Sequence, residues 1–524
     1  DPGHMIAGSL EGFVKITGPN GLIIYGRNFF YDESSMNIWS DSEVRFAYEE
    51  HRGRARGIEM KLIPAAVKPK ELKPAADGIR EIVLRRDVYM ELALKQDKEH
   101  ASKNRSRFAK VKSAGSFTFN LETNQGTFHK DVRVYHPTGP QHADTLDCDQ
   151  LQLQFVRKED PDNPTPEADK KPGHASGKLQ FQELVATGEN VALVSQENQF
   201  SGRMTRLSYN EATKTIVLTD ERSVEIYQQA SKLECPKITI HQDEEGRVET
   251  VLCEGAGKVD YVDPSTGQLT VAAQWAKLMK KSRDPETQLD MVELEQQCII
   301  RQPAEEFALA AQQIRLWLKG DLGALKQKDM LQQDRQQSAK KTAQKVDPHK
   351  MIATQDVAIY SPQLRGKTKR LEVWFDEATV PTSAPNAPVS KSVAPQKSAI
   401  QPAAFAVDDT PAGQQGGRTP LGPEKKEPEP VMVVSDLIKL RMQKDAAGKA
   451  EVSEVWTEGN VSVKQLNETQ KQPMHITGNQ MHIQNKGEND QVLHVMGTPA
   501  KINGGESQIE GDDIFLYRLA NRAE

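Results

Sequence analysis

The segment MHITGNQMHI, residues 474–483, carries the pattern that predicts the fold. Apolar and polar residues alternate before Gly478, and Met481 and Ile483 alternate with polar residues after it. Such alternation is typical of a β-strand with one buried face. The step from Gly478 to Met481 reverses the phase, so a straight strand would turn its second half outward. We therefore predict a bulge or sharp corner at the glycine, where a small residue fits crowded backbone.

The same template recurs along the chain: an apolar residue, a small residue, and two further apolar residues in the opposite phase. Clear copies centre on Gly26, Cys148, Cys235, Ala311, Gly478 and Gly511, and looser copies on Gly57, Gly202 and Ala273. The spacing is 31–38 residues from Gly26 to Gly57, along Gly202, Cys235, Ala273 and Ala311, and from Gly478 to Gly511. Such a period is typical of stacked repeats that cannot bury their apolar faces singly. The sequence therefore predicts an all-β protein, an elongated antiparallel stack on the order of 90 Å long at the usual strand spacing. Each copy is expected to be a short strand, a corner and another short strand.

Composition divides the chain into repeat regions and polar insertions. The predicted segments are a vector-derived remnant (1–5), N-terminal repeats (6–155), a polar loop (156–177), middle repeats (178–320), a Gln/Lys-rich insertion (321–350), a short β segment (351–375), a Pro/Ala-rich disordered linker (376–450) and C-terminal repeats (451–524). The Gln/Lys-rich insertion can form a helix but offers few apolar residues to pack it. The Pro/Ala-rich linker cannot bury enough surface to order itself.

Charge and hydropathy exclude some classes of function. The net charge of −6 argues against a nucleic-acid-binding protein, because such proteins neutralise phosphates with an excess of Lys and Arg. The sequence contains no apolar run long enough for a membrane-spanning helix. A signal peptide or membrane anchor ahead of the remnant is left open.

The chain lacks the motifs of common enzymes. It contains no GxSxG, HExxH, Walker A or strand-linked GxGxxG pattern, and its carboxylates are scattered over predicted solvent faces. We therefore predict no catalytic residues and no cofactor. Two groups of candidate metal ligands are expected to form no metal site. The first is His475 with His482, which are expected to face solvent. The second is His142, Asp144, Asp147, Cys148 and Asp149 of HADTLDCD, whose carboxylates are expected to point outward.

The four cysteines lack the paired CxxC spacing of a structural zinc site. Cys148 and Cys235 occupy the small position of the template, so packing explains them better than chemistry. The sequence leaves open whether Cys148, Cys235, Cys253 or Cys298 forms a disulfide between stacked layers.

The C-terminal repeats, read as VWTEGNVSV, MHITGNQMHI and GESQIEGDDIFLYR, resemble the OstA-like domain of lipopolysaccharide-transport proteins. The matching features are Gly459-Asn460-Val461, Gly478-Asn479 before Met481, Gly497 before Pro499, and Gly511-Asp512 before Ile514. The resemblance is best over 452–517 and weaker over 9–63, 126–155 and 179–318. The family includes a soluble periplasmic bridge protein, its inner-membrane-anchored partner and the N-terminal part of the outer-membrane translocon.

This resemblance implies a β-jellyroll bent into a V-shaped trough that carries the acyl chains of lipopolysaccharide or a similar glycolipid. It also implies the periplasm of a Gram-negative-type bacterium, edge-strand stacking with other OstA-like domains, and an inner-membrane transport complex and outer-membrane translocon as partners. The residues expected inside the trough are Val14, Ile16, Ile24, Phe29, Val191, Leu193, Val461, Val463, Ile476, Met481, Ile483, Val495, Ile509, Ile514 and Leu516.

Two other functions fit the same repeat. A β-solenoid carbohydrate-active enzyme would show a cleft of acidic residues and a dry, filled interior. A structural envelope scaffold would fill the same interior with large side chains and bind no ligand. The small residues at the corners favour the conduit, because they leave space where a packed solenoid would carry larger residues.

Overall fold

The computed structural model describes residues 6–18, 21–65, 76–93, 108–139, 142–158, 178–196, 199–264, 266–320, 347–362, 364–376, 430–444, 450–465, 474–485, 491–504 and 507–518. These residues form 26 strands of one sheet and a short 3-10 helix, η3 (Pro303–Glu305). The strands are β1 Ala7–Thr17, β2 Ile23–Asp32, β3 Asn37–Tyr48, β4 His51–Pro64, β5 Ala76–Ala93, β6 Phe108–Ser113, β7 Phe117–Asn120, β8 Gln125–Pro137, β9 Ala143–Lys158, β10 Lys178–Ser195, β11 Phe200–Asn210, β12 Thr215–Gln228, β13 Ser231–Gln242, β14 Val248–Glu254, β15 Gly257–Val262, β16 Leu269–Trp275, β17 Leu278–Arg283, β18 Asp290–Gln302, β19 Phe307–Lys319, β20 Asp347–Tyr360, β21 Leu364–Asp376, β22 Val431–Lys444, β23 Ala450–Gln465, β24 Met474–Asn485, β25 Gln491–Gly504 and β26 Ser507–Arg518. Within these ranges, no helix has the length and apolarity that crossing a bilayer requires.

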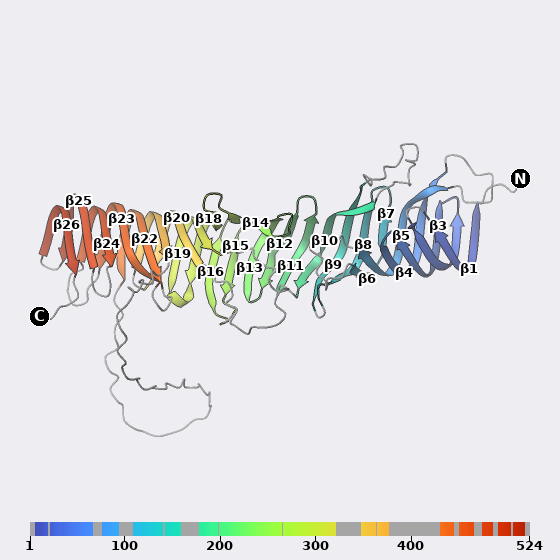
Figure 1. Cartoon of the computed structure of the whole chain (residues 1–524), viewed down its shortest axis with the longest axis horizontal. Coiled ribbons are helices and arrows are strands. Elements are labelled where there is room, and N and C mark those ends of the chain that lie inside the picture. The colour runs from blue at the N-terminus through green and yellow to red at the C-terminus, as the bar shows by residue number, and fades with distance from the viewer. Residues whose placement is uncertain are drawn as a thin grey trace, which may run out of the picture.

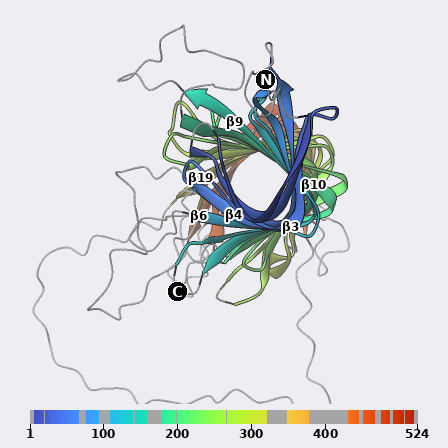
Figure 2. The same cartoon turned by 90° about the vertical axis from the view of Figure 1, so that its right-hand side faces the viewer.

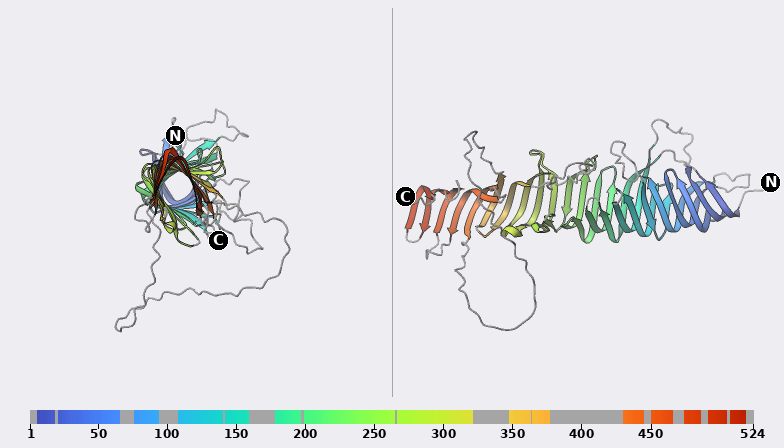
Figure 3. Two further views of the ribbon diagram at one scale, coloured as in Figure 1. Left: turned by 90° about the vertical axis from the view of Figure 1, so that its left-hand side faces the viewer. Right: turned by 60° about the horizontal axis from the view of Figure 1, so that its bottom comes forward.

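Strands follow one another along a single long axis, from β1 at one end to β26 at the other (Figure 1). Neighbouring layers pair antiparallel, except β21 with β22. Three layers consist of two shorter strands each: β6 with β7, β14 with β15, and β16 with β17. The stack of the described strands is therefore on the order of 110 Å long at about 4.8 Å per layer. The predicted all-β, elongated antiparallel architecture is confirmed (Figure 3).

Each long strand bends once near its middle, at the phase reversal that the sequence template predicts. The register of β24 against β25 shifts between Thr477 and Gln480, beside Gly478. The register of β2 against β3 shifts between Tyr25 and Phe30. The predicted corner is confirmed. Most copies are one continuous bent strand rather than two short ones, because backbone pairing resumes directly after the bulge, whereas the copy centred on Ala273 is two short strands, β16 and β17.

The corners divide every long strand between two walls that wrap around a common axis (Figure 2). We term arm 1 the wall that holds Ile24 of β2 and Ile476 of β24. Arm 2 is the wall that holds Phe29 of β2 and Met481 of β24. These four side chains are at most 2% exposed, although the pairs differ in phase along their strands. The apolar core therefore lies between the arms and runs along the stack.

One pairing differs from the rest of the meander. Strands β21 and β22 run parallel, with register partners from Leu364 and Val431 to Asp376 and Gln443. The interpretation of 376–450 as linker is wrong for β22, whose inward side chains Val433 and Ile438 are buried. The Pro/Ala-rich composition of the preceding stretch hid the alternation in VMVVSDLIKL. The predicted remnant, and most of the predicted polar loop, Gln/Lys-rich insertion and linker, lie outside the described residues. These stretches are 1–5, 159–177, 321–346, 377–429 and 445–449.

The corner positions should differ in their tolerance of a methyl group according to whether another strand covers them. A Cβ on Gly478 would lie 2.8 Å from the Met496 carbonyl oxygen, whereas the nearest atom to a Cβ on Gly511, in the last strand, is 3.8 Å away. We expect Gly478→Ala to destabilise β24 and its neighbours by about 1–3 kcal/mol through overpacking. Gly511→Ala, at the same template position, should change stability little.

Hydrogen–deuterium exchange of the β23–β25 amides measures this difference locally. Faster exchange in Gly478→Ala alone is the expected result. Equal exchange in the two variants would show that backbone crowding does not require the small corner residue.

Candidate functional site

The interior of arm 1 carries one unbroken row of side chains from the first strand to the last. Each member is the direct register partner of the next, from Ile16 in β1 through Ile24 in β2 to Ile502 and Ile509 at the other end. Between Ile24 and Ile502 the row is Phe46, Gly53, Met90, Val111, Val134, Leu146, Leu193, Gly202, Ile226, Leu233, Val259, Ala273, Ile300, Leu309, Ile359, Gly366, Val433, Val463 and Ile476. Every member is apolar or glycine.

Arm 2 carries a matching row, which runs by direct register partners from Tyr31 in β2 to Leu516 in β26. Its members are Tyr31, Ile38, Met60, Ile82, Phe119, Gly126, Leu153, Leu184, Tyr209, Ile216, Ile240, Val251, Lys281, Val292, Leu316, Met351, Val373, Leu440, Val455, Ile483, Leu493 and Leu516. Lys281 is the one charged residue in either row. The two rows line an apolar track along the described stack.

At the C-terminal end of the stack, in β24 to β26, exposure of the inward side chains increases with distance from the corner. In β24, Ile476 and Met481 flank the corner and are 2% and 1% exposed, whereas Ile483, farther along arm 2, is half-buried. Leu493 and Leu516 are half-buried in the same row. A ligand in the trough would therefore first meet the outer row of arm 2, and the residues at the corner would become accessible only if the arms separated.

The residues predicted to line the trough are brought together as a group. All of them belong to the apolar core or pack against it, except Ile509. Ile509 has the inward register of its buried partner Ile502 but is 45% exposed, because β26 is the last strand of the described sheet and no other described strand covers it. The predicted lining residues lie on β1, β2, β10 and β23 to β26. The row members on the other strands were missed, although strict alternation beside each corner could have identified them.

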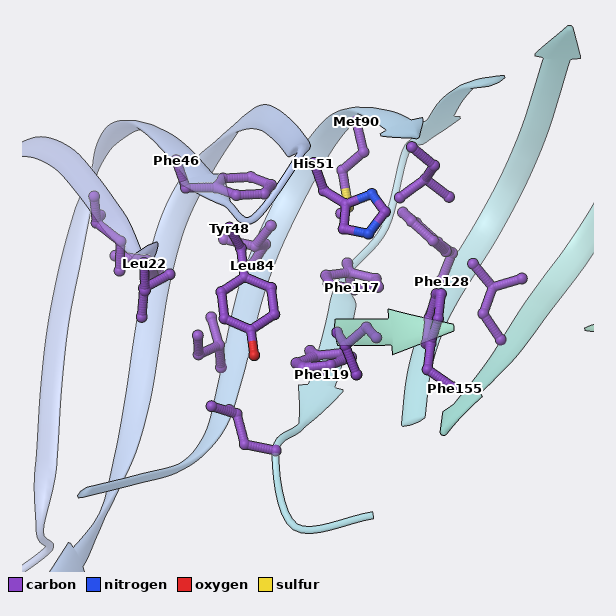
Figure 4. Close-up of a pocket in the computed structure, with 17 residues that line it drawn as sticks. Leu22, Phe46, Tyr48, His51, Leu84, Met90, Phe117, Phe119, Phe128 and Phe155 are labelled. Carbon is purple, nitrogen blue, oxygen red and sulfur yellow. The ribbon is translucent and has the colours of Figure 1, made fainter. Parts of the chain in front are cut away.

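An apolar cavity of about 60 Å³ lies between the arms near the N-terminal end of the stack (Figure 4). Phe46 and Met90 line it from arm 1, and Phe117, Phe119 and Phe155 line it from arm 2. The cavity is too small for an acyl chain. The two walls therefore pack against each other here, and a chain could enter only by displacing them.

His51 also borders this cavity, at the start of β4. Burial lowers the pKa of His51, against a smaller opposing effect of Glu50, so the imidazole is neutral at neutral pH. Its Nδ1 accepts a hydrogen bond of 3.1 Å from the backbone N–H of Ala93. The histidine thus adds no charge to the apolar lining.

The tips of the two arms touch directly beside this cavity. Arg157, at the tip of arm 2, donates a 2.5 Å hydrogen bond to the hydroxyl of Tyr48 and lies 3.6 Å from the carboxylate of Glu49. Tyr48 and Glu49 lie at the tip of arm 1, and the Tyr48 ring packs 6.0 Å from that of Phe119. The Arg157 side chain is only 9% exposed. We term Tyr48, Glu49 and Arg157 the latch, because they bridge the mouth of the trough.

The histidines of the opening template contact other residues of the outer surface. His475 shares a 3.1 Å hydrogen bond with Ser462, and His482 lies 2.5 Å from Glu454 and packs against the Trp456 ring. In the HADTLDCD segment, Asp147 pairs with Arg133 and Asp149 accepts a hydrogen bond from the backbone N–H of Glu189. Within the described ranges, no three His, Cys, Asp or Glu side chains come together in a possible metal site.

All four cysteines are buried free thiols. Burial raises the pKa of Cys148 to about 12 and that of Cys298 to about 11, so both stay protonated and weakly nucleophilic at neutral pH. The Cys235 thiol contacts the backbone carbonyl oxygens of Lys237 at 3.4 Å and Glu254 at 3.2 Å. These surroundings agree with a packing role.

Comparison with known proteins identifies one family. Residues 113–282 match the model of the family described as "LptA/(LptD N-terminal domain) LPS transport protein". No curated protein matches the chain. The match covers about a third of the chain and falls on the middle repeats, β7 to β17, where both rows continue by direct register partners. Residues 113–282 therefore belong to the OstA-like family of lipopolysaccharide-transport domains.

Proposed function

We propose that this protein is a non-enzymatic lipid conduit of the bacterial envelope, which binds the acyl chains of lipopolysaccharide or a related glycolipid between its two arms. The pair of apolar rows carries this proposal, because a moving acyl chain would find similar apolar surface at every strand, with Lys281 in arm 2 as the one charged exception. The family match over residues 113–282 supports lipopolysaccharide as the cargo.

The energetics favour a trough over a closed site. Burying an acyl chain stabilises the complex by about 0.8 kcal/mol per CH₂, while the open mouth leaves a sugar head in water. Successive positions along the rows are nearly alike, so the bound states differ little in free energy. Directional movement along the track would then need free energy supplied by a partner protein, and no chemical reaction in this chain.

The two ends of the stack offer surfaces for such partners. Strand β1 pairs only with β2, and β26 only with β25, among the described strands. Leu10 and Phe13 in β1 are 59% and 71% exposed, and Ile509 in β26 is 45% exposed. Free strand edges invite pairing with another sheet, so we propose that OstA-like domains of an inner-membrane complex and an outer-membrane translocon extend the track at these ends.

A structural scaffold is the second candidate, and the tight packing beside the corners favours it. Ile24 and Val495 are fully buried, and the cavity of Figure 4 is small. The scaffold would keep its arms closed and bind no lipid, so lipid contact separates the two candidates.

Photo-crosslinking with lipopolysaccharide tests the conduit. A photoreactive residue at Ile483 or Leu516 should label strongly and one at Ile476 or Met481 less, because the first pair is half-buried and the second lies beside the corner. Outward positions 475 and 482 serve as controls. Equal labelling at all positions, or none, would remove the conduit and favour the scaffold.

Opening of the latch should control how quickly lipid enters the N-terminal part of the trough. Arg157→Gln removes the ion pair with Glu49 across the mouth, and we expect lipid to load several-fold faster, as measured by crosslinking time courses at Phe155. Arg133→Gln is the matched control, because Arg133 pairs with Asp147 on the neighbouring strand and does not span the mouth. A loading rate that is unchanged in folded Arg157→Gln would show that the latch does not limit entry.

End-to-end association should depend on the uncovered end of the arm 1 row. Ile509→Lys places a charge where a capping strand would bury an apolar side chain, so we expect weaker association with a partner domain. Tyr360→Lys changes another exposed residue, in the middle of the stack, and should have no effect. Analytical ultracentrifugation measures both, and an equal response of the two variants would contradict pairing through β26.

A further inference from the structure

The row on arm 2 is interrupted by one charged side chain in the described structure. Lys281 in β17 stands between Val251 of β14 and Val292 of β18, its direct register partners. The residue is 8% exposed. An ammonium group therefore lies inside a track whose other members are apolar, tyrosine or glycine.

The ammonium is held at the outer edge of arm 2. Its Nζ lies 3.3 Å from a carboxylate oxygen of Asp290, which begins β18, and donates to the Val248 carbonyl at 3.5 Å. Asp290 is itself 8% exposed and pairs in register with the apolar Leu318. The charge thus sits where the apolar wall ends and the mouth of the trough begins.

Stability alone does not explain this pair. Removing two charges from water costs several kcal/mol per ion, and apolar residues of similar size in place of a buried pair often stabilise a protein. An apolar residue at position 281 would simply continue the row. The longer contact to Val248 is weak, and a lysine ammonium has three donors, so it can accept an additional anionic partner.

We propose that Lys281 recognises an anionic phosphate on the head of the amphiphile, and that Asp290 holds the ammonium in place while the trough is empty. This inference rests on the proposed conduit function. Acyl chains would lie along the two rows, and the phosphate would meet Lys281 at the mouth. The lysine then distinguishes phosphorylated glycolipids from neutral ones as they pass the middle of the stack.

Two substitutions should change phosphate preference in opposite directions. Lys281→Met keeps the volume and removes the charge, so we expect the preference for lipid A over dephosphorylated lipid A to fall about tenfold, the usual effect of losing one charged hydrogen bond. Asp290→Asn removes the competing carboxylate, so the same preference should rise. A competition assay with labelled lipid A and the full chain, monitored by fluorescence anisotropy, measures the phosphate preference of both variants.

Lys280→Met is the matched control. Lys280 is the next residue of β17, and alternation places its side chain on the opposite face of the strand, so its removal should leave the preference unchanged. The double variant Lys281→Met with Asp290→Leu replaces the whole pair by apolar side chains. It should fold and bind both lipids equally, which keeps the test valid if Lys281→Met alone is unstable.

Each outcome has one meaning. Opposite shifts in the two single variants support the proposal. Parallel losses of stability with unchanged preference would show an ion pair that only holds β17 to β18, and would overturn it. Competition by inorganic phosphate as strong as by lipid A would show a free-phosphate site instead. If neither lipid binds the wild-type chain, the conduit itself fails, which is distinguishable from failure of Lys281 alone.

Discussion

The reversal of strand phase at each corner is the constraint on which the rest of the structure depends. A β-strand alternates its faces strictly, so a strand that bends from one wall of a V to the other would expose its second half to solvent. The bulge beside Gly478 inserts the extra residue that returns Met481 to the interior. Where this correction is repeated at every layer, both walls keep an apolar inner face along the whole stack.

Because the bulge recurs in successive strands, the register of each strand depends on that of all its neighbours in the stack. Each row member pairs directly with the next, so a slip in one strand would replace an apolar side chain by its polar neighbour in the track. Strands β21 and β22 show how firmly the rows are kept. Their pairing is parallel rather than antiparallel, yet it still brings Val373 beside Leu440 and Gly366 beside Val433. The direction of the chain changes at this seam, while the inner surface does not.

The sequence predicts most of this architecture because the template is local. Gly478, Cys235 and Ala311 lie at corners beside register shifts, and Ile24 and Ile476 point inward, all from patterns spanning ten residues. The latch could not be predicted, because Tyr48 and Arg157 are 109 residues apart and meet only when the twisted arms close. The inward position of Lys281 could not be predicted either. β17 is short, so a lysine at an apolar position of its alternation pattern suggests a solvent-exposed strand end. Its meaning depends on Val251 and Val292 in two other strands.

A track of equivalent positions has a consequence for how polar groups can act in it. Apolar contacts are non-directional and would hold an acyl chain without fixing its position, so in the proposed conduit neither row could select a cargo or stop it. Selection requires a directional interaction, and a charged group inside an apolar wall supplies one because its attraction is strong where water is scarce. The described rows contain one such group, Lys281. The latch places a second polar contact across the mouth, beside the cavity near the N-terminal end of the stack. In the proposed conduit, the apolar rows would allow passage, whereas these few charged side chains are the places where the protein could recognise what passes.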